Sequence, residues 1–130
     1  MRYRVLSGGI MAAVLCLWPL RAQSVTRDTF LVQTTRDLVE LCTAKEDDPL
    51  YTAAVNFCHG YLVGAYQYQV AAQSGPGVTP LFCMSNPAPT RQEGIRMFVS
   101  WVQENTQYGG DRPVDSIMRF LATKWPCAKR

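Results

Sequence analysis

The sequence predicts an all-α protein: a single small four-helix domain stapled by two disulfides. Four stretches of the chain repeat apolar residues at steps of three and four, the spacing of one helical face. Segments rich in glycine and proline separate these stretches. No stretch alternates apolar and polar residues as a half-buried strand would.

The N-terminal segment is typical of a secretory signal peptide. Two arginines among the first four residues precede an apolar run, and Ala22 offers a small residue at the cleavage position. We assign residues 1–22 to the signal peptide and residues 23–130 to the exported helical domain. The apolar run is short for a bilayer-spanning helix, which needs about 20 residues. A lipoprotein anchored through Cys16 is the weaker alternative, because a bulky leucine precedes that cysteine.

The charge balance argues against nucleic acid and membrane surfaces as partners. The chain has 13 basic and 10 acidic residues, and three of the arginines lie in residues 1–22, which carry no acid. The exported domain therefore has ten residues of each sign. A balanced charge gives no electrostatic reason to expect binding to phosphates or anionic lipids.

The first two helices are expected at about residues 26–43 and 49–73. The expected inner face of the first helix comprises Phe30, Leu31, Thr34, Leu38, Leu41 and Cys42. Asp48 followed by Pro49 predicts an N-cap and a first-turn proline for the second helix. The expected inner face of that helix comprises Ala54, Val55, Cys58, Tyr61, Leu62 and Ala65.

The last two helices begin at recognisable start signals. Thr90 opens the sequence TRQE, a capping box in which the hydroxyl of Thr90 and the carboxylate of Glu93 each accept a backbone N–H. The expected inner face of this third helix comprises Ile95, Phe98, Val99 and Val102. Pro113 starts the fourth helix, whose expected inner face comprises Val114, Ile117, Met118, Leu121 and Ala122.

The neighbours Cys58 and His59 admit three interpretations: a nucleophile with its base, a metal site, or a disulfide cysteine beside a structural histidine. Adjacent helical residues point about 100° apart, so these two side chains do not face each other. The exported domain has an even number of cysteines, Cys42, Cys58, Cys83 and Cys127. In a small exported chain this pattern indicates two disulfides, and no pair has the Cys-x-x-Cys spacing of a compact zinc site. We therefore expect no catalytic residue and no metal or other cofactor.

Gly60 and Gly64 are four residues apart in the second helix. Residues at this spacing lie on one helical face. Each glycine costs about 1 kcal/mol relative to alanine in a helix interior. We expect close approach of another helix to compensate for that cost.

These residues carry a resemblance to the Rap/Tai family of periplasmic immunity proteins of type VI secretion. Leu38 and Cys42 match the end of that family's first helix. A Cys-x-Gly-Tyr-Leu-x-Gly motif follows, matched by Cys58, Gly60, Tyr61, Leu62 and Gly64. A loop cysteine comes next, matched by Cys83. An aromatic-Pro-Cys end is matched by Trp125, Pro126 and Cys127.

The resemblance implies a non-enzymatic periplasmic immunity protein. Its partner would be a peptidoglycan amidase toxin delivered by type VI secretion, which it binds and inhibits, and it could act as a homodimer. The shared motif residues define the scaffold, so the contacts are expected in the loops, at Glu46, Asp47, Tyr108 and Asp111. The alternatives are an HdeA-like acid-stress chaperone and a protein with no toxin partner on the same scaffold.

Four cysteines allow three pairings. In an up-down helical arrangement the end of the first helix lies near the start of the second, which favours Cys42–Cys58. The start of the third helix would lie near the end of the fourth, which favours Cys83–Cys127. A Cys42–Cys127 linkage remains open at this point.

Overall fold

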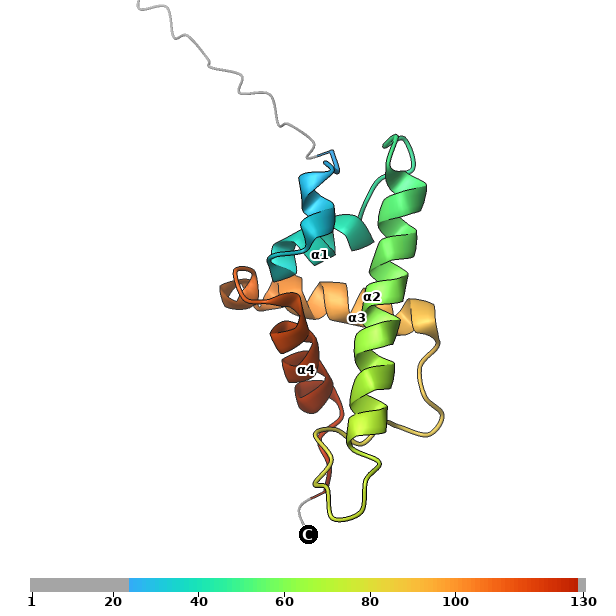
Figure 1. Cartoon of the computed structure of the whole chain (residues 1–130), viewed down its shortest axis with the longest axis vertical. Coiled ribbons are helices and arrows are strands. Elements are labelled where there is room, and N and C mark those ends of the chain that lie inside the picture. The colour runs from blue at the N-terminus through green and yellow to red at the C-terminus, as the bar shows by residue number, and fades with distance from the viewer. Residues whose placement is uncertain (1–23, 129–130) are drawn as a thin grey trace, which may run out of the picture.

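The computed structural model describes residues 24–128, so the predicted signal peptide lies outside the described residues. The described chain holds four α-helices and two short 3-10 helices, without a strand among its residues. In order, these elements are η1 (Asp28–Leu31), α1 (Thr35–Cys42), α2 (Tyr51–Ala72), α3 (Arg91–Glu104), η2 (Thr106–Tyr108) and α4 (Pro113–Lys124). In Figure 1, α2 runs along the molecule, α3 crosses behind it, and α4 lies below α3, to the left of α2. The predicted all-α class is confirmed.

The first predicted helix is wrong as a single element, because the chain breaks between η1 and α1. Val32 adopts a positive φ of 47°, a conformation that a helix cannot contain and that β-branched residues rarely adopt. Thr34 then starts α1 with a capping box in which Asp37 N–H donates to the Thr34 hydroxyl and Thr34 N–H donates to the Asp37 carboxylate. Leu31, expected on the inner face, is 66% exposed as a result.

The start of α2 also differs from the prediction. The helix begins at Tyr51, and Asp48 lies in the turn before it rather than at the N-cap. The Asp48 carboxylate accepts 2.8 Å hydrogen bonds from the N–H groups of Val25 and Leu50. It therefore ties the beginning of the described chain to the α1–α2 loop.

The two later helices begin where expected. Thr90 and Glu93 form the predicted capping box of α3, and Pro113 is the first residue of α4. The inner face of α4 is only partly as predicted: Ile117 and Leu121 are buried, but Val114 is 43% exposed and Phe120, which was not expected there, is 4% exposed.

One core joins all four helices. Its fully buried members include Leu38 and Leu41 from α1, Ala54 and Cys58 from α2, and Phe98 from α3. Phe82, from the long α2–α3 loop, is also buried and lies against Tyr66 of α2, with ring centroids 5.8 Å apart. The loop therefore forms part of the core.

Two disulfides join the elements in the favoured pairing. Cys42 at the end of α1 is bonded to Cys58 of α2, with Cα atoms 5.1 Å apart. Cys83 in the α2–α3 loop is bonded to Cys127 after α4, with Cα atoms 4.9 Å apart. The predicted two disulfides are confirmed, and the Cys42–Cys127 alternative is excluded.

Candidate functional site

The neighbours Cys58 and His59 do not form a catalytic pair. Cys58 is fully buried and its sulfur is bonded to Cys42, so it offers no thiolate as a nucleophile. His59 is half-buried on the next position of α2. The cysteine of the motif therefore serves as a link between α1 and α2.

The remaining bulky residues of the motif anchor α2 by packing. Leu62 lies one turn after Cys58 on the buried side of the helix. Tyr61 is half-buried, and burial raises the pKa of its phenol. Its ring stacks on Phe57, which in turn meets Phe30 edge to face at a centroid distance of 5.7 Å. An aromatic cluster thus connects α2 to η1.

The expected role of Gly60 and Gly64 in close helix packing is wrong. Both glycines are exposed, and a Cβ atom built on either would meet no heavy atom within 4 Å. The reason is the helical phase, because the buried residues Ala54, Cys58 and Leu62 occupy the other side of α2. On the side of α2 that faces solvent, the two glycines instead leave a surface without side chains.

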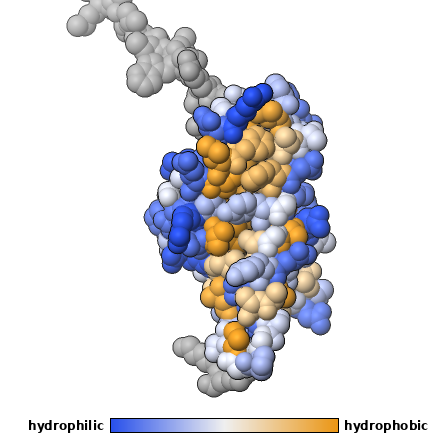
Figure 2. All heavy atoms as spheres, viewed as in Figure 1, coloured by the Kyte–Doolittle hydropathy of each residue, from blue (hydrophilic) through white to orange (hydrophobic). Residues whose placement is uncertain are grey.

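That exposed side, which we call the outer face of α2, comprises Phe57, Gly60, Gly64 and Tyr68. The 22 residues of α2 include no Asp, Glu, Lys or Arg, although much of the helix is exposed. Phe57 is 37% exposed and Tyr68 is 74% exposed. In Figure 2, apolar atoms gather over η1 and the first half of α2. A solvated helix face usually carries charges, so this uncharged face has the composition of a contact surface.

Glu46 and Asp47 lie in the loop that precedes α2. Both side chains are exposed. The neighbouring Asp48 holds the loop against the start of the described chain, near η1. The loop with the two acids, η1 and the beginning of α2 lie at the same end of the molecule (Figure 1).

Tyr108 and Asp111 occupy a different place, the α3–α4 connection, away from the loop before α2 (Figure 1). The ring of Tyr108 stacks on Trp101 at a centroid distance of 5.3 Å, and the guanidinium of Arg119 lies 4.6 Å from its centre. The carbonyl oxygen of Asp111 accepts hydrogen bonds from Thr35. Both residues therefore have packing or hydrogen-bonding roles within the domain, and the four candidate contacts do not form one site.

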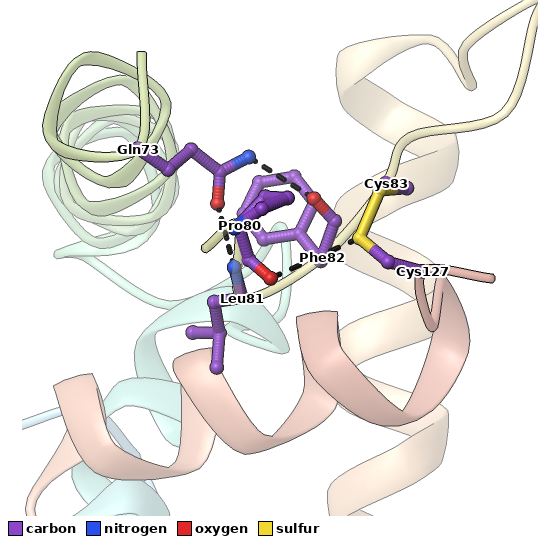
Figure 3. Close-up of a disulfide and its surroundings, with 6 residues drawn as sticks. All are labelled: Gln73, Pro80, Leu81, Phe82, Cys83 and Cys127. Atoms are coloured by element: carbon purple, nitrogen blue, oxygen red, sulfur yellow. Dashed lines mark hydrogen bonds between the residues drawn. A yellow bond between two sulfur atoms is a disulfide. The ribbon is translucent and has the colours of Figure 1, made fainter. Parts of the chain in front are cut away.

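The terminal motif closes the opposite end of the molecule. The N–H of Cys83 donates to the carbonyl of Trp125 at 2.8 Å, next to the Cys83–Cys127 disulfide, while Pro126 is exposed. Figure 3 shows Gln73, at the end of α2, bridging the same loop. Its amide nitrogen donates to the carbonyl of Phe82 and its amide oxygen accepts from Leu81 N–H.

The dashed contact of Cys127 in Figure 3 is of a different kind. Its sulfur lies 3.8 Å from the carbonyl oxygen of Pro80. An oxidised cysteine has no S–H group, so we describe this approach as a van der Waals contact. The loop is therefore held by the Gln73 amide, the Cys83 N–H and the disulfide. Sequence reasoning missed Gln73, because a single glutamine after a helix carries no motif.

The described residues show neither a metal cluster nor a membrane span. No three His, Cys, Asp or Glu side chains gather as metal ligands within residues 24–128. None of the helices in that range is both long and apolar enough to cross a bilayer.

Comparison with known proteins identifies one relationship. A family model described as Rap1a immunity proteins matches residues 34–127, from the cap of α1 to the last cysteine. The match covers 94 of the 130 residues and contains all four helices and both disulfides. No curated protein and no solved structure matches the chain.

Proposed function

We propose that this chain, which belongs to the Rap1a family of immunity proteins, protects the cell that makes it by binding and inhibiting a toxin. The family match over residues 34–127 carries the proposal, and it favours an immunity protein over an acid-stress chaperone. We further propose that the toxin is a peptidoglycan amidase delivered by type VI secretion. Inhibition would come from covering the toxin's active-site groove, without catalysis and without a cofactor.

The periplasm is the proposed place of action. Residues 1–22 have the order of a signal peptide, whose removal would leave a domain from residue 23. The two disulfides are bonds that an oxidising compartment maintains. An amidase that cuts peptidoglycan would meet its inhibitor in that compartment.

The apolar and acidic end of the molecule is the best supported contact surface for the toxin. It combines the first part of the outer face of α2, at Phe57 and Gly60, with the exposed Leu31 of η1 and the exposed acids Glu46 and Asp47. The outer face continues along the helix to Gly64 and Tyr68. Apolar area supplies affinity, while acids at its rim attract a partner of positive charge. We therefore propose a toxin surface with an apolar centre and a basic rim. Tyr108 and Asp111 stay proposed contacts of lower priority, since both already support the fold.

A homodimer is a further expectation that the family resemblance implies. Sedimentation of the oxidised domain at several concentrations would measure its mass. Because a dimer could cover part of the exposed surface, the mass should be known before binding variants are interpreted.

Co-purification with toxins of the source strain tests the proposal. The oxidised domain, residues 23–130, would serve as bait for each secreted amidase of that strain, and captured proteins would be identified by mass spectrometry. The expected result is one amidase in stoichiometric amount. Cells that express this amidase in the periplasm should survive when they also make the chain. Capture of no amidase, or lysis despite expression of the chain, would refute the proposal.

Two variants test whether the outer face of α2 contacts the toxin. Gly64→Arg places a charge on the outer face of α2, where a side chain has room. Val114→Arg is the matched control, because Val114 is an exposed apolar residue of α4 outside the proposed surface. Weaker capture by Gly64→Arg alone is expected. Equal capture by both variants would remove the outer face of α2 from the interface.

A further inference from the structure

An apolar groove lies between the second half of α2, the segment before α3, α3 itself and α4. Its volume is about 260 Å³, and it is partly open to solvent. Aromatic and aliphatic side chains from all four segments form its walls, among them Leu62, Tyr66, Met84, Phe98, Phe120 and Trp125. The groove is separate from the outer face of α2, whose four residues do not line it.

The polar groups of the groove are few. Gln67, Thr90 and Arg91 line it, and among the lining residues that the structure describes Arg91 alone is charged. Within the described residues, no carboxylate lies within 4 Å of the Arg91 guanidinium. The nearest acid in sequence, Glu93, accepts hydrogen bonds from Thr90 in the capping box. Arg91 is therefore free to pair with an anionic group of a ligand.

The volume limits the size of such a ligand. An apolar cavity of about 150 Å³ holds benzene, whereas pockets for drug-sized ligands begin at about 300 Å³. A groove of about 260 Å³ thus suits one short acyl chain and is too small for a two-chain lipid.

We propose that this groove binds a single short to medium acyl chain whose carboxylate pairs with Arg91. The hydrocarbon would replace water against the half-buried walls formed by Tyr66, Met84 and Trp125. The carboxylate would stay at the open side, where water and Arg91 both solvate it. Charge complementarity selects this occupant: a neutral or cationic chain would gain the same apolar contacts without the ion pair.

A substitution at Gly94 of α3 can test whether the groove binds a ligand. Gly94 lines the groove, and a Cβ at this position would meet no heavy atom within 4 Å. Gly94→Leu should therefore fill the groove without displacing the backbone. Gly64→Leu is the matched control, because Gly64 is also a helical glycine with open space around its Cβ but lies outside the groove.

Binding would be measured by calorimetry and by the intrinsic fluorescence of Trp101 and Trp125 together, with decanoate, decanol and decyltrimethylammonium below their micelle concentrations. We expect saturable binding of decanoate at one molecule per domain. Arg91→Gln should weaken decanoate binding about fivefold, as for loss of a partly exposed ion pair, and leave decanol unchanged. Gly94→Leu should abolish binding of decanoate and decanol, and Gly64→Leu should abolish neither.

Three results would overturn the proposal. The first is decanoate binding that does not saturate. The second is unchanged decanoate binding by Gly94→Leu, provided circular dichroism shows that this variant folds like the wild type. The third is absence of decanoate binding by the wild-type domain. Loss of toxin capture in Gly94→Leu would in that case assign the groove to a toxin side chain.

Discussion

Two buried hydroxyl groups connect α1 to the start of α4. Thr35 and Ser116 are both fully buried, and their hydroxyl oxygens lie 2.7 Å apart. The Thr35 hydroxyl also donates to the carbonyl of Asp111 at 3.0 Å, as does its backbone N–H at 2.8 Å. The next N–H, of Arg36, donates to the carbonyl of Gly109 at 3.0 Å. Two first-turn donors of α1, which a helix leaves unpaired, are thus satisfied by the α3–α4 connection.

Thr35→Val should lower the free energy of unfolding by about 1–3 kcal/mol, because the buried Ser116 hydroxyl keeps only its 3.5 Å contact with the carbonyl of Tyr108. Thr35→Val with Ser116→Ala should cost less than the two single changes added together. Urea denaturation of the four proteins measures the coupling. Strictly additive losses would show that the two hydroxyls do not stabilise each other.

At the level of secondary structure, α1 and α3 begin with the same capping motif. Each has a threonine N-cap and an acid at the third helical residue, with both reciprocal hydrogen bonds formed. In α3, the hydrogen bonds from the hydroxyl and N–H of Thr90 lower the pKa of Glu93 below its ordinary 4.5. A carboxyl with a lowered folded-state pKa adds stability above its unfolded-state pKa. This contribution is lost as the pH falls through the folded-state pKa.

Thr90→Ala should lower the free energy of unfolding by about 1 kcal/mol at pH 7, the usual cost of a lost cap. The difference between this variant and the wild type should shrink as the pH falls from the ordinary pKa of Glu93, 4.5, through its lower folded-state pKa. Thermal unfolding between pH 3 and pH 7 measures it. A difference that stays constant over this range would contradict the role of the Glu93 carboxylate.

The sequence predicts an element well where its signal is local. Two helix starts depend only on residues close in sequence. These are the capping box of Thr90 and Glu93 at α3 and the first-turn proline, Pro113, at α4, and both predictions are confirmed. Thr34 and Asp37 carry the same signal, but the apolar spacing from Phe30 to Leu41 hid the break at Val32. Periodicity alone cannot show such a break, because the apolar residues on either side of it still face one core.

The candidate site was harder to predict, because it depends on the phase of α2 and on contacts distant in sequence. The spacing of Gly60 and Gly64 gives one helical face but does not say whether that face is inside or outside. Residues of α2, α3 and α4 together form the apolar groove, so the sequence of a single segment does not predict it. Family resemblance supplied the scaffold residues without the surface that binds a partner.

At the scale of the whole molecule, the two disulfides hold its two ends. The Cys42–Cys58 bond spans 16 residues and fixes α1 against α2, near the proposed toxin surface. The Cys83–Cys127 bond spans 44 residues and fixes the long loop against the C-terminus, next to Met84 and Trp125 of the groove. Loss of each bond should consequently affect a different surface.

Replacing both cysteines of a disulfide by serine should lower the free energy of unfolding. We expect a loss of about 3 kcal/mol for the Cys42–Cys58 pair and about 4 kcal/mol for the Cys83–Cys127 pair. The second loss is larger because that disulfide closes a longer loop. Chemical denaturation under oxidising conditions measures both. A larger loss for the shorter loop would mean that packing around Cys58, rather than loop closure, dominates.

The proposed inhibition of a cell-wall amidase can be measured with purified proteins. The captured amidase would be titrated with the oxidised domain, and its activity would be monitored as the release of cleaved peptidoglycan. We expect activity to fall linearly to zero at one domain per enzyme, with Gly64→Arg needing a clear excess and Val114→Arg matching the wild type. Full amidase activity in the presence of excess wild-type domain would contradict the proposed inhibition.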